Sequence, residues 1–118
     1  MRIAILALAL MAGGQSLVAC QSSDVSRELG ARCDLNSECD ERCLTPSTDW
    51  PGGFCTITCD SDADCPSDAA CINEETSAVC AYTCFTDPGC QFLGAGYKCS
   101  ERDHHGATAG KVFVCRGG

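Results

Sequence analysis

The stretch CDSDADCPSDAACINEETSAVCAYTC, residues 59–84, holds the cysteine spacing on which the predicted fold depends. Its first two cysteines enclose five residues, its third and fourth enclose eight, and three residues then lead to the next cysteine. Five-residue gaps also follow Cys33 and Cys84, so twelve cysteines fall into three units of four with periods of 26 and 25 residues. Gaps that coincide at a fixed period predict an internal repeat.

The composition predicts a fold held together by cross-links. The chain has 13 cysteines in 118 residues, and its large apolar residues after Cys33 are scattered, with no long amphipathic run. A short chain of this kind cannot bury a large core, so disulfides must supply much of its stability. We therefore predict a small disulfide-rich fold of three tandem four-cysteine modules, built from short β-hairpins and irregular loops, at residues 33–58, 59–83 and 84–118.

The pairing within each unit has three alternatives, and cysteine count alone does not choose among them. The geometry favours first-to-third and second-to-fourth bridges, because the first two cysteines lie on a tight turn and the last two on the strands of a hairpin. The bridges favoured in this way are Cys33–Cys43, Cys39–Cys55, Cys59–Cys71, Cys65–Cys80, Cys84–Cys99 and Cys90–Cys115.

Short strands are predicted where β-branched and aromatic residues gather between turn signals. These segments are residues 54–59, 70–73, 78–84, 96–100 and 111–115. A helical turn is predicted in each five-residue loop.

Residues 1–19 have the features of an export signal. Arg2 precedes an apolar run at residues 3–12, which is shorter than the roughly 20 residues that a membrane-spanning helix needs. Export fits paired cysteines, because disulfides persist in oxidising compartments.

The thirteenth cysteine, Cys20, stands apart from the three units. Leu17-Val18-Ala19-Cys20 resembles the lipobox of bacterial lipoproteins, which implies that Cys20 becomes the first mature residue and carries acyl chains. The alternative is a buried or disulfide-bonded Cys20. Residues 20–32 are then a lipidated cysteine and a flexible polar tether. The predicted location is the bacterial cell envelope, at the outer membrane, with secretion as the alternative.

The segment WPGGFCTITCDSDADCPSDAAC, residues 50–71, resembles the cysteine-rich lipoproteins that are abundant in myxobacteria and their relatives. Those proteins share an aromatic-Pro-Gly-Gly-aromatic-Cys step followed by aspartate-rich loops. The units are also loosely similar to EGF-like or dickkopf-type four-cysteine modules. The resemblance implies an exported protein of tandem modules and implies no particular activity. The third unit departs from the pattern, because 15 residues separate its last two cysteines and its opening loop lacks alternating acids.

Three aspartates alternate in the second unit, at Asp60, Asp62 and Asp64. Carboxylate oxygens are calcium ligands, which makes this loop a candidate calcium site. The complete EF-hand pattern, with its glycine and closing glutamate, is absent. The favoured interpretation is that Asp62, like Asn36 and Asp87 at the equivalent positions, caps its turn by accepting backbone hydrogen bonds.

Two further residue pairs are candidates for binding. His104 and His105 could chelate zinc or copper, although a solvated loop is the favoured interpretation because metal ligands are usually spaced apart. Trp50 and Phe54 flank a Pro-Gly-Gly turn and are candidates for contact with a partner. The alternative for these two is packing on the disulfides of the first unit.

The sequence argues against catalysis and against nucleic-acid binding. It contains no nucleophile constellation, so we predict that the protein is not an enzyme. Without Arg2, seven Lys and Arg face 16 Asp and Glu, a formal net charge of −9 that repels phosphate backbones. The predicted function is extracellular binding or adhesion, anchored to the membrane by lipid, with a protein or glycan partner at the cell surface. The alternatives are a structural envelope component without a specific ligand and a secreted inhibitor or toxin-like effector. No cofactor is predicted apart from the candidate calcium.

Overall fold

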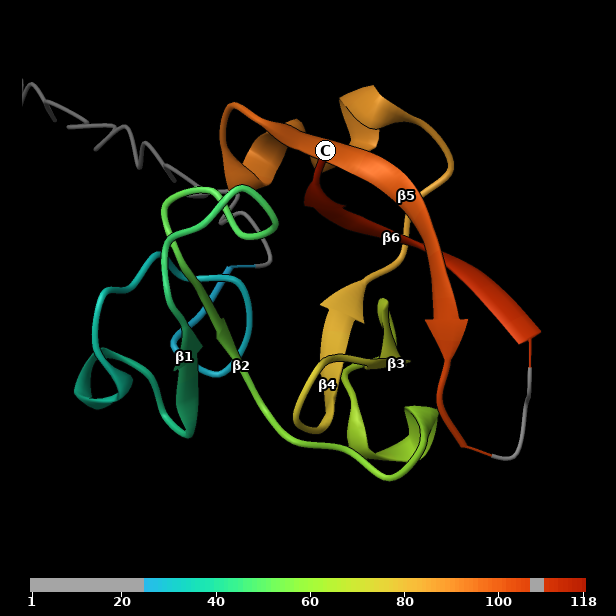
Figure 1. Cartoon of the computed structure of the whole chain (residues 1–118), viewed down its shortest axis with the longest axis horizontal. Coiled ribbons are helices and arrows are strands. Elements are labelled where there is room, and N and C mark those ends of the chain that lie inside the picture. Colours follow the sequence, from blue (N-terminus) through green and yellow to red (C-terminus); the bar gives the residue numbers. More distant parts are fainter. Residues whose placement is uncertain (1–24, 107–109) are drawn as a thin grey trace, which may run out of the picture.

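The computed structural model describes residues 25–106 and 110–118, which form a small, mostly β fold with two antiparallel sheets (Figure 1). No helix in these two ranges is long and apolar enough to cross a membrane. The strands are β1 (Arg42–Leu44), β2 (Phe54–Thr56), β3 (Ala69–Asn73), β4 (Ala78–Tyr82), β5 (Tyr97–His104) and β6 (Gly110–Gly117), and the short 3-10 helices are η1 (Asn36–Glu38), η2 (Asp62–Asp64) and η3 (Asp87–Leu93). The predicted strands and helical turns are therefore present, and β1 is an additional strand that was not predicted.

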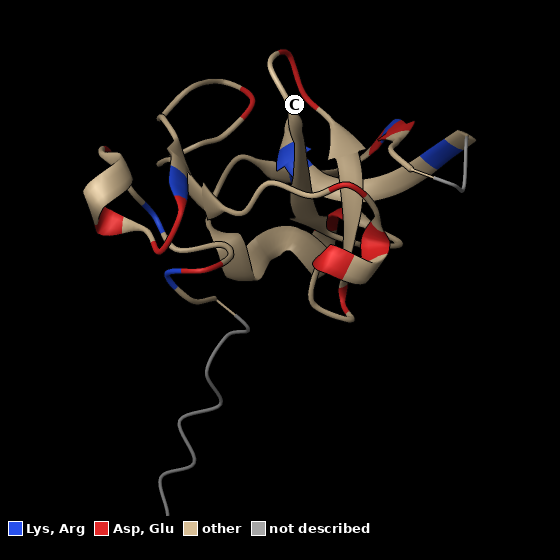
Figure 2. Ribbon diagram, turned by 90° about the horizontal axis from the view of Figure 1, so that it is seen from below, with Lys and Arg blue, Asp and Glu red and all other residues tan. Residues whose placement is uncertain are grey.

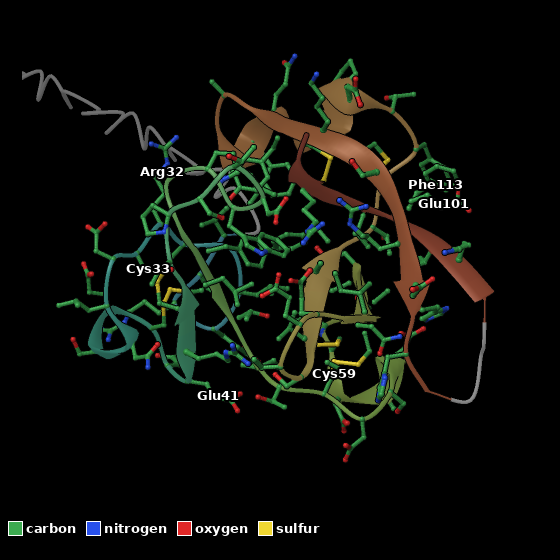
Figure 3. All side chains as sticks on the ribbon, in the orientation of Figure 1. Arg32, Cys33, Glu41, Cys59, Glu101 and Phe113 are labelled. Atoms are coloured by element: carbon green, nitrogen blue, oxygen red, sulfur yellow. A yellow bond between two sulfur atoms is a disulfide. The ribbon has the colours of Figure 1, made fainter. Side chains whose placement is uncertain are left out.

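The twelve cysteines from Cys33 to Cys115 form six disulfides with the first-to-third, second-to-fourth pairing that the sequence favours. The bridges at Cys33 and Cys59 lie beside different sheets (Figure 3). In every hairpin the third and fourth cysteines of a unit stand directly opposite each other and bond back to the preceding turn. These opposed pairs are Cys43 and Cys55, Cys71 and Cys80, and Cys99 and Cys115.

A side-chain cap recurs where each turn meets its hairpin. Asn36 Oδ1 accepts a hydrogen bond from the Cys43 N–H at 2.9 Å. Asp62 Oδ1 and Asp87 Oδ1 accept from the third cysteines of their own units, Cys71 and Cys99, at 2.7 and 2.9 Å. The predicted capping role of these three positions is confirmed, and it ties the first part of each unit to the first strand of its hairpin.

The second and third units share one sheet, in the strand order β4-β3-β5-β6. Ile72 in β3 pairs with His104 in β5, which joins the two hairpins. Beyond the ends of the strands, Thr83 bridges to Val114 in β6, and Thr58 bridges to Val79 in β4. The units are consequently not separate bodies, since backbone hydrogen bonds continue across each boundary between them.

The main core draws on all three units, and Phe54 lies in it with no exposed surface. Its ring centroid is 4.8 Å from that of Trp50, 6.2 Å from that of Tyr82 and 6.4 Å from that of Tyr97. The prediction that Trp50 and Phe54 are contact residues is not supported by this arrangement, because Trp50 is only 4% exposed. They pack in the shared core, whereas the four cysteines of the first unit form a separate cluster.

The segment predicted as a flexible tether is folded over its described part, residues 25–32. Leu29 is 1% exposed and belongs to the main core, and its carbonyl accepts a hydrogen bond from the Tyr82 hydroxyl at 2.9 Å. Two backbone hydrogen bonds connect this segment to Cys55. The Gly30 N–H donates to the Cys55 carbonyl, and the Cys55 N–H donates to the Ala31 carbonyl, both at 2.8 Å. The tether prediction is therefore wrong for these residues, because burial of the apolar Leu29 side chain favours an ordered segment. Residues 20–24 lie outside the described ranges.

Candidate functional site

The guanidinium of Arg116 is where side chains from all three units meet. Arg116 follows the last cysteine on β6, and its Nη2 lies 3.0 Å from Glu74 Oε1 and 3.3 Å from Asp49 Oδ2. Its Cζ lies 5.5 Å from the ring centroid of Trp50, in a cation–π arrangement. The side chains of Arg116 and Glu74 are only 13% and 11% exposed, so their charges interact with little screening by water.

Backbone hydrogen bonds hold the two loops that carry Asp49 and Glu74. In the hairpin turn between β3 and β4, the Glu74 N–H donates to the Ser77 carbonyl at 3.1 Å. In the loop before β2, the Trp50 N–H donates to Ser47 Oγ at 3.1 Å. The Asp49 carbonyl accepts from the Gly117 N–H at 2.7 Å, which fastens this loop to β6.

The two loops enclose a cleft that we call the Glu74 cleft, made of two adjoining pockets that share Glu74 and Glu75. The first pocket has a volume of about 300 Å³ and includes Arg42, Asp49 and Trp50 in its lining. The second has a volume of about 260 Å³, and Asn73, Arg102 and Arg116 complete its lining. Each pocket is close to the lower limit of small-ligand sites in proteins. The cleft is thus a candidate binding site bordered by three arginines and three carboxylates.

Charge elsewhere on the molecule is predominantly acidic (Figure 2). The exposed apolar side chains include Phe85 and Phe113, which are 101% and 52% exposed. Phe113 lies on β6 beside its strand partner Glu101, on the face away from the core (Figure 3).

The candidate calcium loop directs its carboxylates to protein partners. Asp64 Oδ2 accepts the Asp60 N–H at 2.8 Å, and Asp62 caps the Cys71 N–H. Within the described ranges, the groups of acidic, histidine or cysteine side chains whose ligand atoms converge consist of disulfide-bonded cysteines. The structure therefore does not bring Asp60, Asp62 and Asp64 together as a set of cation ligands.

The two histidines hold the second and third units together instead of extending into solvent. His104 Nε2 lies 2.8 and 2.7 Å from the two carboxylate oxygens of Asp62, and its side chain is 12% exposed. The His105 N–H donates to the Cys71 carbonyl at 2.8 Å, and His105 Nδ1 lies 2.5 Å from Asn73 Oδ1. The prediction of a solvated loop is therefore wrong for both histidines, and a structural contact between units takes its place.

Substituting Asp62 with asparagine should reduce the acid sensitivity of the fold. Burial raises the pKa of Asp62, but the Cys71 N–H and the neighbouring His104 outweigh burial, so the pKa lies below its usual value of 3.8. A depressed carboxyl pKa stabilises the fold above 3.8, and this stability is lost as the pH falls through the folded-state value. As the pH falls from 3.8 to the folded-state pKa, the melting temperature of the wild type should therefore fall more steeply than that of Asp62→Asn.

The asparagine variant isolates the charge, because Asn36 already makes the equivalent cap in the first unit. At neutral pH the variant should lose about 0.5 kcal/mol, since the Asp62 side chain is 46% exposed and water screens the pair. Thermal unfolding followed by circular dichroism across the acid range is the measurement. Parallel pH profiles for the two proteins would show that the Asp62–His104 pair has no role in acid stability.

Apart from Trp50, the residues of the Glu74 cleft were not identified from the sequence. Glu74 and Arg116 are 42 positions apart, and no local motif connects them. One signal was present, because Val112 and the fully buried Val114 alternate along the strand predicted at residues 111–115, and Arg116 continues this alternation one residue beyond its end. An arginine on the inward face of a strand needs a partner, which marks Arg116 as a residue of interest.

Comparison with known proteins found no matching family model, no matching curated protein and no matching solved structure.

Proposed function

We propose that this chain is a lipid-anchored protein of the bacterial cell envelope, at the outer membrane, that displays three disulfide-stapled modules for extracellular binding. The observation that carries the proposal is the pairing of all twelve described cysteines with one another. No described cysteine is left as a partner for Cys20, which lies in the lipobox-like sequence. This supports lipidation of Cys20 over its use in a disulfide. Six disulfides are also consistent with an extracellular or secreted location.

The binding role is supported by the rigidity of the scaffold and by the Glu74 cleft. Disulfides restrict the loops that border the cleft, so less conformational entropy is lost when a ligand is bound. All three units contribute charged side chains to the lining of the cleft. These are Arg42 and Asp49 from the first unit, Glu74 and Glu75 from the second, and Arg102 and Arg116 from the third. The repeated turn cap and the opposed cysteine pairs support the view that the units are related copies.

Substituting Cys20 with serine should abolish membrane retention, because a serine hydroxyl cannot form the thioether that holds the diacylglycerol. Burial of each acyl methylene contributes about 0.8 kcal/mol, so loss of two or three chains removes nearly all of the anchoring free energy. The measurements are membrane fractionation and the intact mass of the protein before and after reduction. The wild type should be heavier than its mature chain by acyl groups and should gain twelve hydrogens on reduction of six bridges.

The result that contradicts the anchor is a Cys20→Ser protein of mature length that still fractionates with membranes. The binding role is tested separately, by adding the purified, oxidised chain to cells that lack it and measuring the protein retained on their surface. If none is retained, a structural envelope component without a specific ligand becomes the better interpretation.

A further inference from the structure

We propose that the protein rests on the phospholipid surface of the membrane that holds its Cys20 acyl chains, through a surface that we call the Phe92 face. This face consists of Arg32, the turn at residues 51–52 and residues 92–96, which include the end of η3. The inference rests on the proposed lipid anchor and deepens it, because it says which side of the molecule contacts the membrane.

The short chain between Cys20 and the folded part limits how the molecule can be placed on a membrane. Residues 25–32 already belong to the fold, and a fully extended chain from Cys20 to Val25 spans at most about 18 Å. A folded domain of about 90 residues has a radius of gyration of about 12 Å, which makes it about 30 Å across. The side opposite Val25 therefore cannot reach the membrane, and the surface around Val25 lies next to it.

The end of η3 lies beside the start of the described chain. The ring centroid of Phe92 is 5.1 Å from that of Tyr82, in an edge-to-face contact. A Cβ on Gly30 would lie 2.8 Å from Tyr82 Cε2 and 3.3 Å from Leu93 Cδ2, so η3 packs directly on this segment. Gly30 forms a β-bridge with Ser26, which brings Phe92 close to the point where the described chain begins.

Phe92 supplies the apolar contact with the membrane. It remains 41% exposed although its ring packs against Tyr82. An exposed aromatic side chain gains free energy when it leaves water for the boundary between lipid headgroups and acyl chains. The loop that follows, Gly94-Ala95-Gly96, carries no bulky polar side chain that would hold the headgroups away from Phe92.

Arg32 supplies a positive charge for contact with lipid phosphates. Its side chain lies across two glycines, because a Cβ on Gly94 would be 2.2 Å from Arg32 Nη2 and one on Gly52 would be 3.4 Å from its Cδ and Nε. Arg32 is exposed at the edge of the molecule (Figure 3), and among the residues that the structure describes no carboxylate forms an ion pair with it. A guanidinium binds phosphate oxygens through two N–H groups at once, which suits Arg32 to a phospholipid headgroup.

The two loops that Arg32 covers lack acidic residues, in contrast to the rest of the chain. Residues 50–53 and 91–96 contain none of the 16 Asp and Glu, and Asp49, which precedes the first loop, pairs with Arg116 at 3.3 Å. The whole chain has twice as many acidic as basic residues, so most of its surface is repelled by the negative potential of a membrane. A face with an exposed arginine and no acid in its loops is therefore the one best suited to a phospholipid surface.

The test attaches the mature chain, residues 20–118, to vesicles by a route that does not depend on lipidation in the cell. Twelve of the 13 cysteines are paired, so the oxidised chain made to start at Cys20 has one thiol for coupling to maleimide-bearing phosphatidylethanolamine. The vesicles contain phosphatidylcholine with bromine on its acyl chains, which quenches the fluorescence of an indole that enters the membrane. Phe92→Trp is the reporter. Phe113→Trp is the matched control, because Phe113 is 52% exposed and lies across the molecule from Arg32 (Figure 3).

We expect the brominated lipid to quench Phe92→Trp and to leave the emission of Phe113→Trp unchanged. Trp50 is present in both variants and is 4% exposed, so the difference between them reports the substituted position. Adding Arg32→Gln to Phe92→Trp should weaken the quenching about twofold or more, the effect expected when one exposed charged contact is lost.

Arg27→Gln, added to Phe92→Trp in the same way, is the control for the arginine. The Arg27 guanidinium is directed to the first unit, where its Nε lies 3.9 Å from Asp40 Oδ1 and its Nη2 donates to the Ser37 carbonyl at 3.1 Å. Its removal should therefore leave the quenching unchanged. The amide NMR spectrum of each variant in solution establishes that it is folded.

Equal quenching of Phe92→Trp and Phe113→Trp, or no quenching of either, would overturn the proposed membrane contact. Quenching that Arg32→Gln and Arg27→Gln affect alike would overturn the contact of Arg32 with lipid phosphates. Failure of the lipid anchor is a separate result. A Cys20→Ser protein that stays in cell membranes contradicts lipidation and leaves the chemically coupled vesicles unaffected.

Discussion

The variant Phe54→Ala is expected to lower the free energy of unfolding by about 4 kcal/mol, the usual range for a large buried aromatic residue. Phe54 has no exposed surface and stands between Trp50, Tyr82 and Tyr97, which come from the first, second and third units. Truncation removes the burial of its ring and leaves a cavity where the three units meet. The measurement is guanidinium denaturation with the disulfides intact, followed by tryptophan fluorescence, because Trp50 lies beside the substituted residue.

Phe85→Ala is the control for this experiment. The Phe85 side chain is 101% exposed, so its removal should change the free energy of unfolding by less than about 0.5 kcal/mol. A Phe54→Ala protein that unfolds like the wild type but loses cell-surface binding would mean that Phe54 is a contact residue, as the sequence first suggested.

The disulfide pairing could be predicted because it depends on local geometry that spacing reveals. A five-residue gap between the first two cysteines encloses a helical turn, and Cys71 and Cys80 are brought opposite each other by a short hairpin. Both bridges of a unit then connect the turn to the hairpin. The caps at Asn36, Asp62 and Asp87 could be predicted for the same reason, since each lies at a fixed offset from the first cysteine of its unit.

The relation between the units could not be predicted from spacing. It depends on contacts between distant segments, such as the pairing of Ile72 with His104 and the ion pair of Arg116 with Glu74. A repeat pattern describes what each unit does alone and carries no information about how two copies meet. The burial of Trp50 and Phe54 follows from this meeting, because side chains that are exposed in an isolated unit are covered by its neighbours.

The same limitation applies to the candidate site. Each charged residue of the Glu74 cleft has a solvent-facing or ambiguous position when its own segment is considered alone. The charged side chains come into contact only where the turn before β4 meets the end of β6, as in the ion pair of Glu74 with Arg116. Binding sites at junctions between small modules are therefore harder to find from sequence than the cross-links that stabilise the modules.

The second large effect is expected at Gly53, where alanine should destabilise the fold by about 3 kcal/mol, the upper end of the cost of a strained backbone residue. Gly53 has a φ of +79°, in the left-handed region that favours glycine. A Cβ at this position would lie 1.9 Å from the carbonyl oxygen of Cys33, and no side-chain rotation can relieve a contact with backbone. The Gly53 carbonyl also accepts a hydrogen bond from Tyr97, whose pKa burial raises to about 12, so its hydroxyl stays protonated.

Gly89→Ala is the matched control, because a Cβ on Gly89 meets no atom within 4 Å and Gly89 is not among the residues of positive φ. It should change the free energy of unfolding by less than about 0.5 kcal/mol. Guanidinium denaturation of both variants separates the effect of the site from that of adding a methyl group. Because the clash involves Cys33, oxidative refolding of Gly53→Ala should also yield less protein with the Cys33–Cys43 bridge. Equal stability and equal bridge yield in the two variants would mean that the close approach of Gly53 to Cys33 does not hold the first unit in place.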